Sequence, residues 1–436
     1  LGEDRFWEGI QLYVRRHAHS DVETRDLQRA LEDVTGQNLD WYFQQWTELA
    51  VRPVLTVGAT FGDGHVDVHV AQTVDGTHPA FVMPVVVEAK LKSGDVVRTR
   101  GWLEGGSLNL RLDAVEAPTW VAFDPAGGLL ADVDLRISSG MLSALVLDEQ
   151  GPPHARLRAM RALAKDGEAD ALKAVLERSS AHPAMRREAA RGLGEQAALD
   201  ALLPSAQDPD NSVRLEVVKA LGRCFGPTLG TTLRTVALGD TNPDVQGAAL
   251  RGLANVAPAD AVVVARRLAR AGSGDEDQRT GAAFEVLGRH GEVRDLKRLL
   301  GDHPRRLSSQ AYRAATVLVS RQESETLRQD LGAKVARMAE ARLRDDDELT
   351  RTAMVAILGE VGDSRSVALL MALRSDTHID ALASRCTTAI DAIRTRPSDT
   401  VPVGDNALEA RLKALEERLS TLEGTTEDLH GEAGRP

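Results

Sequence analysis

One pattern recurs from Met141 to about Arg394 and limits what this part of the chain can fold into. In each unit a marked position is followed three, four and seven residues later by apolar or small residues. Arg156, for example, is followed by Ala159, Met160 and Leu163. These spacings share one face of an α-helix, so each unit carries an apolar stripe that it cannot bury alone. The marked positions are Arg156, Arg186, Arg214, Gln246, Thr280, Ser308, Arg351 and Arg385, and seven residues beyond them lie Leu163, Leu193, Leu221, Leu253, Leu287, Ala315, Leu358 and Ala392.

A second amphipathic segment lies between successive marked helices, as in Leu172, Val175 and Leu176. Helix pairs that repeat at roughly 30 residues stack into a solenoid. We therefore predict an α-α superhelix of HEAT-like repeats over residues 140–395. Aromatic residues make up only 3% of the chain, which suits stacked helices whose cores are filled by Ala, Leu and Val.

Proline and glycine recur at fixed places in these repeats and indicate where the helices start and end. Pro153, Pro183 and Pro243 precede the marked positions by three residues, where proline is favoured at helix starts. Glycine directly follows several of the residues at the seventh place, and we expect it to end the helix there. These glycines are Gly194, Gly222, Gly288 and Gly359.

The preceding residues form two further regions. Residues 1–52 show helical spacing and an unusual share of aromatic residues, including Phe6, Trp7 and Trp46. From Val54 to about Ile137 the hydrophobic period is two, and His65–Val70 alternates strictly after a Gly-Asp-Gly turn. Short alternating segments separated by turns are typical of a small antiparallel β-sandwich, which we predict over residues 53–139.

The end of the chain differs from the repeats. Residues 396–405 are rich in Pro, Ser and Thr and are predicted to form a linker. Residues 406–436 are predicted to form a short heptad helix followed by a disordered tail, because leucines recur there at alternating spacings of four and three. These are Leu408, Leu412, Leu415, Leu419 and Leu422. An isolated helix of that length is marginal in water, so docking on its own chain, self-association and fraying all remain open.

Composition excludes several functional classes. The net charge of -12 argues against a sequence-independent grip on nucleic acid. No run of about eighteen uncharged apolar residues is present, so we expect no membrane span. The two cysteines, Cys224 and Cys386, cannot build a disulfide framework or a cysteine-based metal site. We expect a soluble protein whose compartment the sequence leaves open, with the cytoplasm slightly favoured.

Candidate chemistry is sparse. The zinc-protease motif HExxH is absent, since no histidine is followed by glutamate. His65, Asp67 and His69 share one face of a predicted strand and are the nearest approach to a metal-ligand set, against an ordinary solvent-facing strand. Three further groups of residues resemble ligands or anion sites, but we expect ordinary structural roles for them. They are His17 and His19 near a helix end, the arginines at the marked positions, which are expected to pair with a carboxylate or carbonyl of the next repeat, and the acidic run Asp345–Glu348 at a helix start. We predict no catalytic, cofactor-binding or metal-ligating residue in this chain.

The opening segment carries a specific resemblance. It is similar to the end of the catalytic domain of M1-family zinc aminopeptidases, the aminopeptidase N group, in which such a helical segment leads through a proline into a β-sandwich and a helical superhelix. The matching residues are Leu1-Gly2-Glu3-Asp4-Arg5-Phe6-Trp7-Glu8-Gly9, Tyr13, His17, Thr24-Arg25-Asp26-Leu27, Leu31-Glu32, Gly36, Leu39, Phe43, Trp46 and Pro53.

The resemblance implies hydrolysis of the N-terminal peptide bond by a zinc-bound water in the full-length parent. The family's HExxH motif, distal glutamate ligand, exopeptidase loop and transition-state tyrosine all precede the matched segment, so none is assigned to a residue here. Leu1 stands where a methionine would begin a chain, and we expect a truncated chain that is inactive alone. Phe6, Trp7, Trp41 and Trp46 would then need the missing N-terminal catalytic domain to cover them.

On this interpretation the chain is the C-terminal, non-catalytic portion that forms the wall and cap of a chamber for peptide substrates. The alternative is a catalytically inactive, M1-like HEAT-repeat scaffold that binds another protein on the concave face of the solenoid.

Overall fold

The computed structural model describes residues 1–396 except 75, 77, 270–276, 302, 304, 345 and 346. The predicted heptad segment and all of the predicted linker beyond Arg396 lie outside the described residues. The chain divides into two compact units, Leu1–His290 and Gly291–Pro436, and each is described separately.

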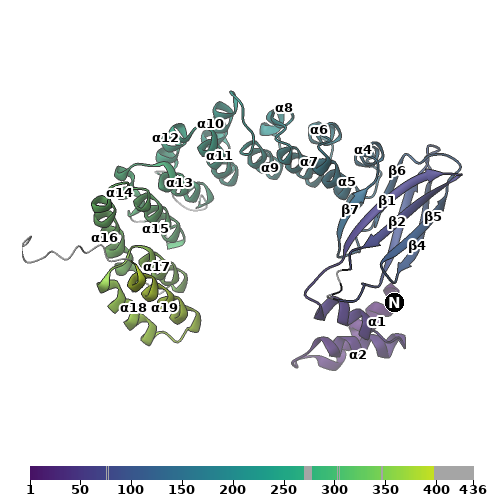
Figure 1. The fold of residues 1–436 in the computed structure, drawn as a ribbon, viewed down its shortest axis with the longest axis horizontal. Helices are drawn as coiled ribbons and strands as arrows, with labels where there is room; N and C mark the ends of the chain where they lie inside the picture. Colours follow the sequence, from purple (N-terminus) through teal and green to yellow (C-terminus); the bar gives the residue numbers. More distant parts are fainter. Residues whose placement is uncertain are drawn as a thin grey trace, which may run out of the picture. The chain divides into compact units, whose positions relative to one another are not determined.

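The first unit begins with a small helical segment, drawn in purple in Figure 1. Its elements are α1 (Glu3–His17), α2 (Thr24–Thr35), α3 (Asp40–Phe43) and the π-helical turn η1 (Gln44–Glu48). Its core is small and consists of the buried side chains of Leu31, Leu39 and Phe43, with Leu27 packed against them. Helix α1 approaches α2 at Gly9, where a Cβ atom would lie 2.5 Å from Cδ2 of Leu31. A larger residue at position 9 would therefore press on the Leu31 side chain, which would have to move.

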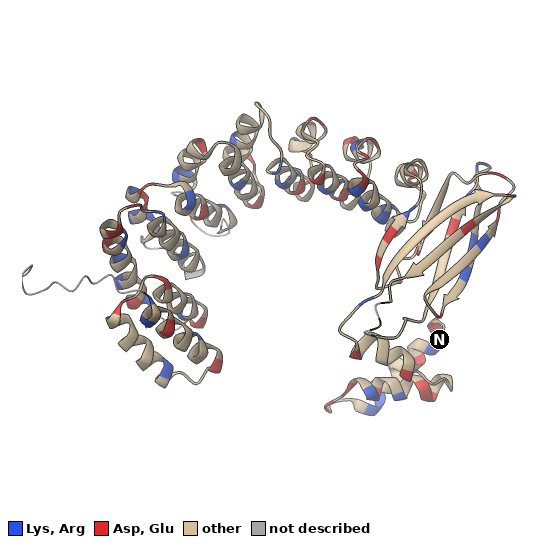
Figure 2. Cartoon of the chain, viewed as in Figure 1, with Lys and Arg blue, Asp and Glu red and all other residues tan. Residues whose placement is uncertain are grey.

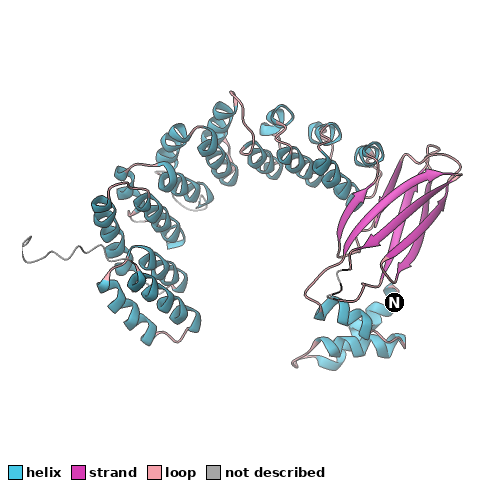
Figure 3. Cartoon of the chain, in the orientation of Figure 1, coloured by secondary structure: helices cyan, strands magenta, loops and turns pink. Residues whose placement is uncertain are grey.

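All strands of the described residues lie between Val54 and Arg136 (Figure 3). They are β1 (Val54–Gly62), β2 (His65–Gln72), β3 (Met83–Lys90), β4 (Val96–Leu103), β5 (Ser107–Asp113), β6 (Trp120–Phe123) and β7 (Asp132–Arg136). They form one sheet in the order β5-β2-β1-β7 and a second in the order β4-β3-β6. Side chains alternate between buried and more exposed along β2 and β3, so Val66, Val68 and Val70 are buried as the alternation predicts.

One strand pair differs from the predicted antiparallel arrangement. Strand β7 runs parallel to β1, with Val54 opposite Asp132 and Gly58 opposite Arg136. A parallel partner requires a long connection, and here the chain passes through the second sheet before β7 returns to β1. Local alternation identifies a strand but carries no information about the direction of its neighbour.

Polar contacts join the sheets to the first repeat helices. Asp148 accepts hydrogen bonds from Lys90 Nζ at 2.7 Å and from Trp120 Nε1 at 2.8 Å. Arg158 lies 2.8 Å from the carboxylate of Asp124. These ion pairs are largely shielded from water and fix the start of the repeats against the end of the strand region.

The rest of the first unit consists of stacked helices. They are α4 (Ser139–Leu147), α5 (Pro153–Asp166), α6 (Asp170–Glu177), α7 (Pro183–Glu195), α8 (Leu199–Leu202), η2 (Leu203–Gln207), α9 (Asn211–Leu221), α10 (Leu229–Gly239), α11 (Pro243–Val256), α12 (Pro258–Leu268) and α13 (Asp277–His290). In Figure 1 α5, α7 and α9 lie side by side in one layer, and α4, α6 and α8 form the other. The predicted apolar stripe lies on α5, α7 and α9 and continues on α11 and α13. Its leucines are fully buried, and they are Leu163, Leu193, Leu221, Leu253 and Leu287.

The second unit continues the pattern. Its elements are η3 (Val293–Asp295), α14 (Leu296–Leu299), α15 (Arg305–Ser320), α16 (Glu325–Arg342), α17 (Glu348–Val361), α18 (Ser364–Asp376) and α19 (Asp380–Thr395). Ala315 and Leu358 are fully buried as predicted. Ala392 is exposed, so the prediction that it faces a neighbouring helix is wrong. Helix α19 buries Cys386, Ala389 and Ile390 instead, because α17 and α18 cover only that face.

The prolines start helices as predicted, whereas most of the glycines do not end them. Pro153, Pro183 and Pro243 are the first residues of α5, α7 and α11. Gly222 is a C-cap, but Gly194, Gly288 and Gly359 lie inside helices, so the prediction that they end their helices is wrong.

These glycines allow neighbouring repeats to approach closely. A Cβ atom at Gly194 would lie 2.6 Å from Cβ of Ala220 in α9, and one at Gly359 would lie 3.3 Å from Ala389 in α19. Both positions face a helix of the next repeat. The glycine after the buried leucine therefore sets the spacing between repeats, and the chain turns a residue or more later.

Candidate functional site

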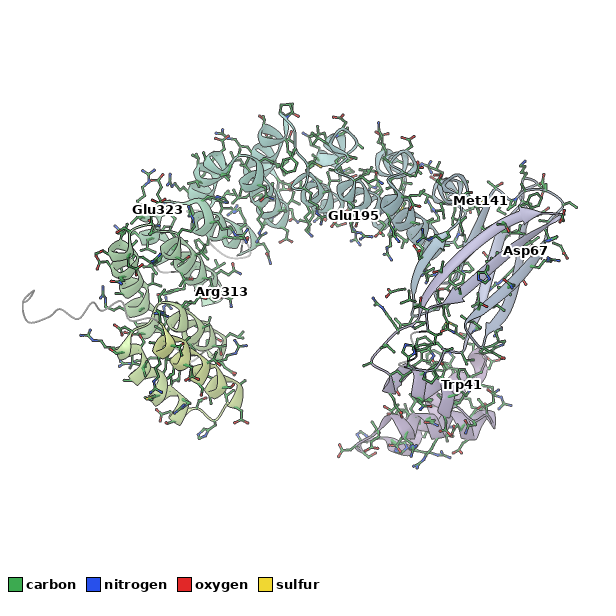
Figure 4. All side chains as sticks on the ribbon, viewed as in Figure 1. Trp41, Asp67, Met141, Glu195, Arg313 and Glu323 are labelled. Carbon is green, nitrogen blue, oxygen red and sulfur yellow. The ribbon has the colours of Figure 1, made fainter. Side chains whose placement is uncertain are left out.

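Five exposed aromatic side chains of the first unit lie on the helical segment and the adjoining strand β4. We call Phe6, Trp7, Trp41, Tyr42 and Trp102 the aromatic set. Their exposed fractions are 40%, 53%, 39%, 46% and 45%. The rings form two contacting groups. The centroids of Phe6 and Trp7 are 5.2 Å apart, and those of Trp41 and Trp102 are 6.4 Å apart. Figure 4 labels Trp41 on this segment.

The rings stay exposed because the segment has little interior of its own. Helix α1 buries only Gly9, so the apolar side chains on both sides of it remain in contact with solvent. Burying a large apolar side chain is worth about 1.5–3 kcal/mol relative to leaving it in water. Exposed apolar groups that gather in one place mark interaction surfaces more often than scattered single residues do.

The segment is nevertheless fixed to the strand region. The side-chain amide of Gln45 donates to the carbonyl of Val82 at 2.8 Å and accepts from the amide of Val82 at 3.0 Å. Trp46 packs on Phe81 with ring centroids 5.3 Å apart. Trp46 is half-buried, so the β region supplies part of the cover that the sequence led us to expect from a missing domain.

The sequence analysis missed Tyr42 and Trp102 as exposed aromatic residues. Trp102 lies near the end of β4, and the guanidinium of Arg100 lies 5.8 Å from the centroid of its ring. Arg98, Arg100 and Trp102 share the outward face of β4, since side chains two apart point the same way. The sequence signal for its exposure was that Trp102 alternates with Arg98 and Arg100 and so shares their face of the strand.

The candidate zinc ligands on β2 are engaged in local contacts. The two ring nitrogens of His65 lie 3.1 Å from the Asp63 carbonyl and 3.0 Å from the Asp67 carboxylate. Asp67 also accepts from Arg111 at 2.9 Å, which lowers the pKa of Asp67 below its usual range. His69 Nδ1 lies 2.7 Å from Oδ1 of Asn109 on β5. Figure 4 labels Asp67 on this sheet.

The other residues considered as ligands lie at helix ends or in the buried core. His17 is in the last turn of α1, and His19 follows it with a left-handed φ of 63°. Asp347 caps α17 by accepting from the amide of Thr350, while Asp345 and Asp346 lie outside the described residues. Burial raises the pKa of both the Cys224 and the Cys386 thiol, which disfavours the thiolate that nucleophilic chemistry needs.

The arginines at the first three marked positions bind neighbouring carbonyls and carboxylates. Arg214 contacts Asp240 through two nitrogens at 2.8 and 3.0 Å, and Arg186 forms a buried ion pair with Asp208. Both partners belong to the next repeat, as expected. Arg156 instead donates to the carbonyl of Val146 at 3.0 Å, so its partner lies in the preceding helix α4. These contacts occupy the guanidinium groups of Arg156, Arg186 and Arg214, so these three arginines do not form an anion site.

A cavity of about 340 Å³ between β7 and α5 is lined by charged residues, but these residues are held in ion pairs and do not form a catalytic arrangement. Its cations Arg158, Arg161 and Lys165 pair with Asp124, Glu188 and Asp134 respectively. Figure 2 shows charges of both signs interspersed along the repeat helices. Within the part of the chain that the structure describes, no three His, Cys, Asp or Glu side chains are placed to hold a metal ion. In the same residues no helix combines the length and apolar character of a membrane span.

Comparison with known proteins points to one group. The chain is 38% identical over 50 residues to aminopeptidase N of Streptomyces lividans, a match that covers 12% of this chain and 6% of the relative. It is 26% identical over 155 residues to the puromycin-sensitive aminopeptidase of Caenorhabditis elegans, covering 34% of this chain and 16% of that protein. These matches confirm the resemblance to aminopeptidase N-like proteins. A third match, to aminopeptidase M1-C of Oryza sativa subsp. japonica, is 33% identical over 57 residues.

The fold agrees with these matches. The structure is similar to that of aminopeptidase A of Legionella pneumophila in complex with aspartic acid, with a TM-score of 0.52 and 12% identity. That likeness covers 89% of this chain and 55% of the Legionella chain. A family model for HEAT repeats matches residues 169–238, which lie within the predicted repeats. The chain thus resembles a C-terminal aminopeptidase portion with HEAT-like repeats, and its matches span 16% or less of each curated relative.

Proposed function

We propose that this chain is the non-catalytic portion of a zinc metallo-aminopeptidase that removes N-terminal residues from peptides. The observation that carries the proposal is the aromatic set on the helical segment, which belongs to the region with the aminopeptidase N resemblance. In the parent protein an N-terminal catalytic domain would cover these rings. The helices and sheets described above would then contribute the wall and the cap of the substrate chamber.

Zinc belongs to the proposal for the parent, and the described residues of this chain do not fit it. A catalytic zinc site needs about three protein ligands and an open position for water. His65, Asp67 and His69 come nearest, but His65 and His69 are four residues apart on a strand, about 13 Å from each other. Each is also held by the contacts given above. We therefore assign no step of the hydrolysis to a residue of this chain.

The test compares residues 1–436 with the longer protein that the proposal requires. Both are purified with zinc, and metal content and cleavage of an aminoacyl reporter are measured. We expect the longer protein to hold stoichiometric zinc and release the N-terminal residue, and residues 1–436 to do neither. Tight zinc binding or reporter cleavage by residues 1–436 alone would overturn the proposal.

The second candidate is a catalytically inactive scaffold that binds another protein along the repeats. The HEAT-repeat match at residues 169–238 favours it, because such stacks present long surfaces to protein partners. The same experiment separates the two. A longer protein that lacks zinc and leaves the reporter intact supports the scaffold.

A further inference from the structure

Strand β7 is an open edge of its sheet. That sheet has the order β5-β2-β1-β7, so β7 pairs with β1 on one side and with no described strand on the other. The amide of Asp132 donates to the carbonyl of Pro53 at 3.0 Å, so the backbone polar groups of Asp132 face β1. Successive residues of a strand direct these groups to opposite sides. Those of Val133 and Leu135 therefore point to the free edge.

The backbone groups at this edge keep their capacity for hydrogen bonds. Among the described residues, no backbone group outside the sheet bonds to the amide or the carbonyl of Val133 or Leu135. A strand edge with such groups is a template on which another extended chain can pair. Because β7 has only the five residues Asp132–Arg136, an added chain would gain two sets of backbone donors and acceptors.

A cavity runs along the same edge. It has a volume of about 340 Å³ and lies between β7 and α5, which are neighbours in Figure 1. Residues 131–135 line it without a break, and Ala162 of α5 lies on its opposite wall. Its apolar lining includes Val54, whose side chain is 43% exposed. The strand edge thus has open space and apolar surface beside it.

The charges beside the cavity favour an acidic side chain in an added chain. Asp134 is shared by two cations, Lys165 at 2.9 Å and Arg136 at 2.7 Å. The other acidic residue of the lining, Asp132, has its own partner in Arg52 at 2.7 Å. One carboxylate therefore faces two cations, and the Lys165 side chain is 66% exposed and within reach of a further carboxylate. Complementary charge of this kind selects between partners.

We propose that this edge binds an extended acidic peptide segment of a partner protein, which adds to the sheet as a strand beside β7. The backbone of the segment pairs with the free groups of Val133 and Leu135, and one of its carboxylates pairs with Lys165. Strand addition takes its affinity from main-chain hydrogen bonds and its specificity from alternate side chains. All of these residues lie in this chain, so the proposal is independent of the proposed peptidase function.

A synthetic peptide tests this on residues 1–436. The probe is the peptide TVEVDVT with blocked ends, and its binding is followed by hydrogen exchange of the protein. We expect saturable binding below about 1 mM and slower exchange in residues 132–136. The same sequence N-methylated at its five central residues cannot donate from either edge. It is expected to bind at least about tenfold more weakly.

A charge reversal in the chain tests the position of the peptide. Lys165→Glu is expected to weaken binding of TVEVDVT about tenfold. The matched control is Lys173→Glu, because Lys173 is a half-exposed lysine on α6 that does not line the cavity. The control is expected to leave binding unchanged. Unaltered exchange in α7 and α11 shows that both variants remain folded.

Three results overturn the proposal. The first is the absence of saturable binding up to about 1 mM peptide. The second is equal binding of the N-methylated peptide, which would mean that the backbone does not pair with β7. The third is binding that survives Lys165→Glu or falls equally in Lys173→Glu, which places the peptide elsewhere. None of these results bears on whether the longer protein holds zinc, so the two proposals fail separately.

Discussion

The helical segment at residues 1–52 and the HEAT-like repeats differ in how much of their apolar surface they bury. Each repeat helix places its stripe against the next repeat, and Leu163, Leu193 and Leu221 are fully buried. The helical segment buries few side chains. Its Trp7 is 53% exposed, although tryptophan is larger and more apolar in area than the leucines of the repeats. Each repeat helix packs against helices of the adjacent repeats. The exposed rings of the helical segment have no such packing surface within the described residues.

The polar contacts differ in the same way. In the repeats Arg186 and Asp208 form an ion pair with exposed fractions of only 5% and 6%. In the helical segment Arg5 and Glu8 form a pair that is 60% and 53% exposed. Shielding from water strengthens an ion pair and makes the loss of one partner costly. The repeat helices thus bury both their apolar stripe and this ion pair, whereas the helical segment leaves aromatic rings and its ion pair exposed.

The largest expected effect is on the buried pair. Asp208→Ala leaves the Arg186 charge buried without its carboxylate and is expected to lower the free energy of unfolding by about 3–5 kcal/mol. Glu8→Ala removes a carboxylate from the exposed pair and is expected to cost less than about 1 kcal/mol. Urea unfolding followed by circular dichroism measures both. Equal losses would contradict the difference drawn between the two regions.

The spacing of the repeats predicts a smaller effect. Gly194→Ala places a methyl group 2.6 Å from Cβ of Ala220, and such overpacking typically costs about 1–3 kcal/mol. The matched control is Gly239→Ala, because a Cβ atom there meets nothing within 4 Å. Replacing that helical glycine by alanine is expected to stabilise the protein by about 0.5–1 kcal/mol. The same thermal shift in both variants would refute the role assigned to Gly194.

The junction between the sheets and the repeats predicts a pH effect. Burial raises the pKa of Asp148, but hydrogen bonds from Lys90 and Trp120 outweigh it and hold that pKa below its usual range. The unfolded state therefore binds the proton at higher pH, and the stabilisation is lost as pH falls below about 4. Asp148→Asn is expected to cost about 1 kcal/mol at neutral pH and to flatten the loss in acid.

Lys90→Met provides the companion measurement for the junction. It removes one of the two donors, so the pKa of Asp148 rises toward its unfolded value and less stability is lost in acid. Urea unfolding from pH 7 to pH 3 follows both variants. An unchanged acid profile in Asp148→Asn would show that this carboxylate does not carry the effect.

The smallest effect is expected in the helical segment. Trp7→Ala within residues 1–436 should change the free energy of unfolding by less than about 0.5 kcal/mol, because an exposed side chain contributes little to the folded state. A loss above about 2 kcal/mol would mean that Trp7 belongs to a core, and the interpretation of the segment as an interface would fail.

The repeats were predictable from the sequence because their signal is local. Ala159, Met160 and Leu163 lie on one helix face whatever surrounds them, and Pro183 favours a helix start in any context. The glycines were misjudged because their role depends on the next repeat. Gly194 and a helix-ending glycine look alike until the position of Ala220 is known. The division into domains at residues 52 and 139 remains a prediction.

The strand pairing and the aromatic set depend on contacts between distant residues. Nothing in Asp132–Arg136 indicates that β7 lies parallel to β1. Trp41 and Trp46 are five residues apart in one aromatic run, yet Phe81 covers only the second. The absence of a recognisable catalytic motif was apparent from the sequence, whereas the exposure of Tyr42 and Trp102 required the structure.

Oxidative footprinting of the aromatic set tests the central claim most directly. Hydroxyl radicals modify exposed aromatic rings, and mass spectrometry gives the rate for each residue. We predict that Trp7 and Trp41 are oxidised rapidly in residues 1–436 and are protected in the longer protein, while the exposed Phe225 in the repeats reacts equally in both. Equal oxidation of Trp7 and Trp41 in the two proteins would contradict the claim that a catalytic domain covers this surface.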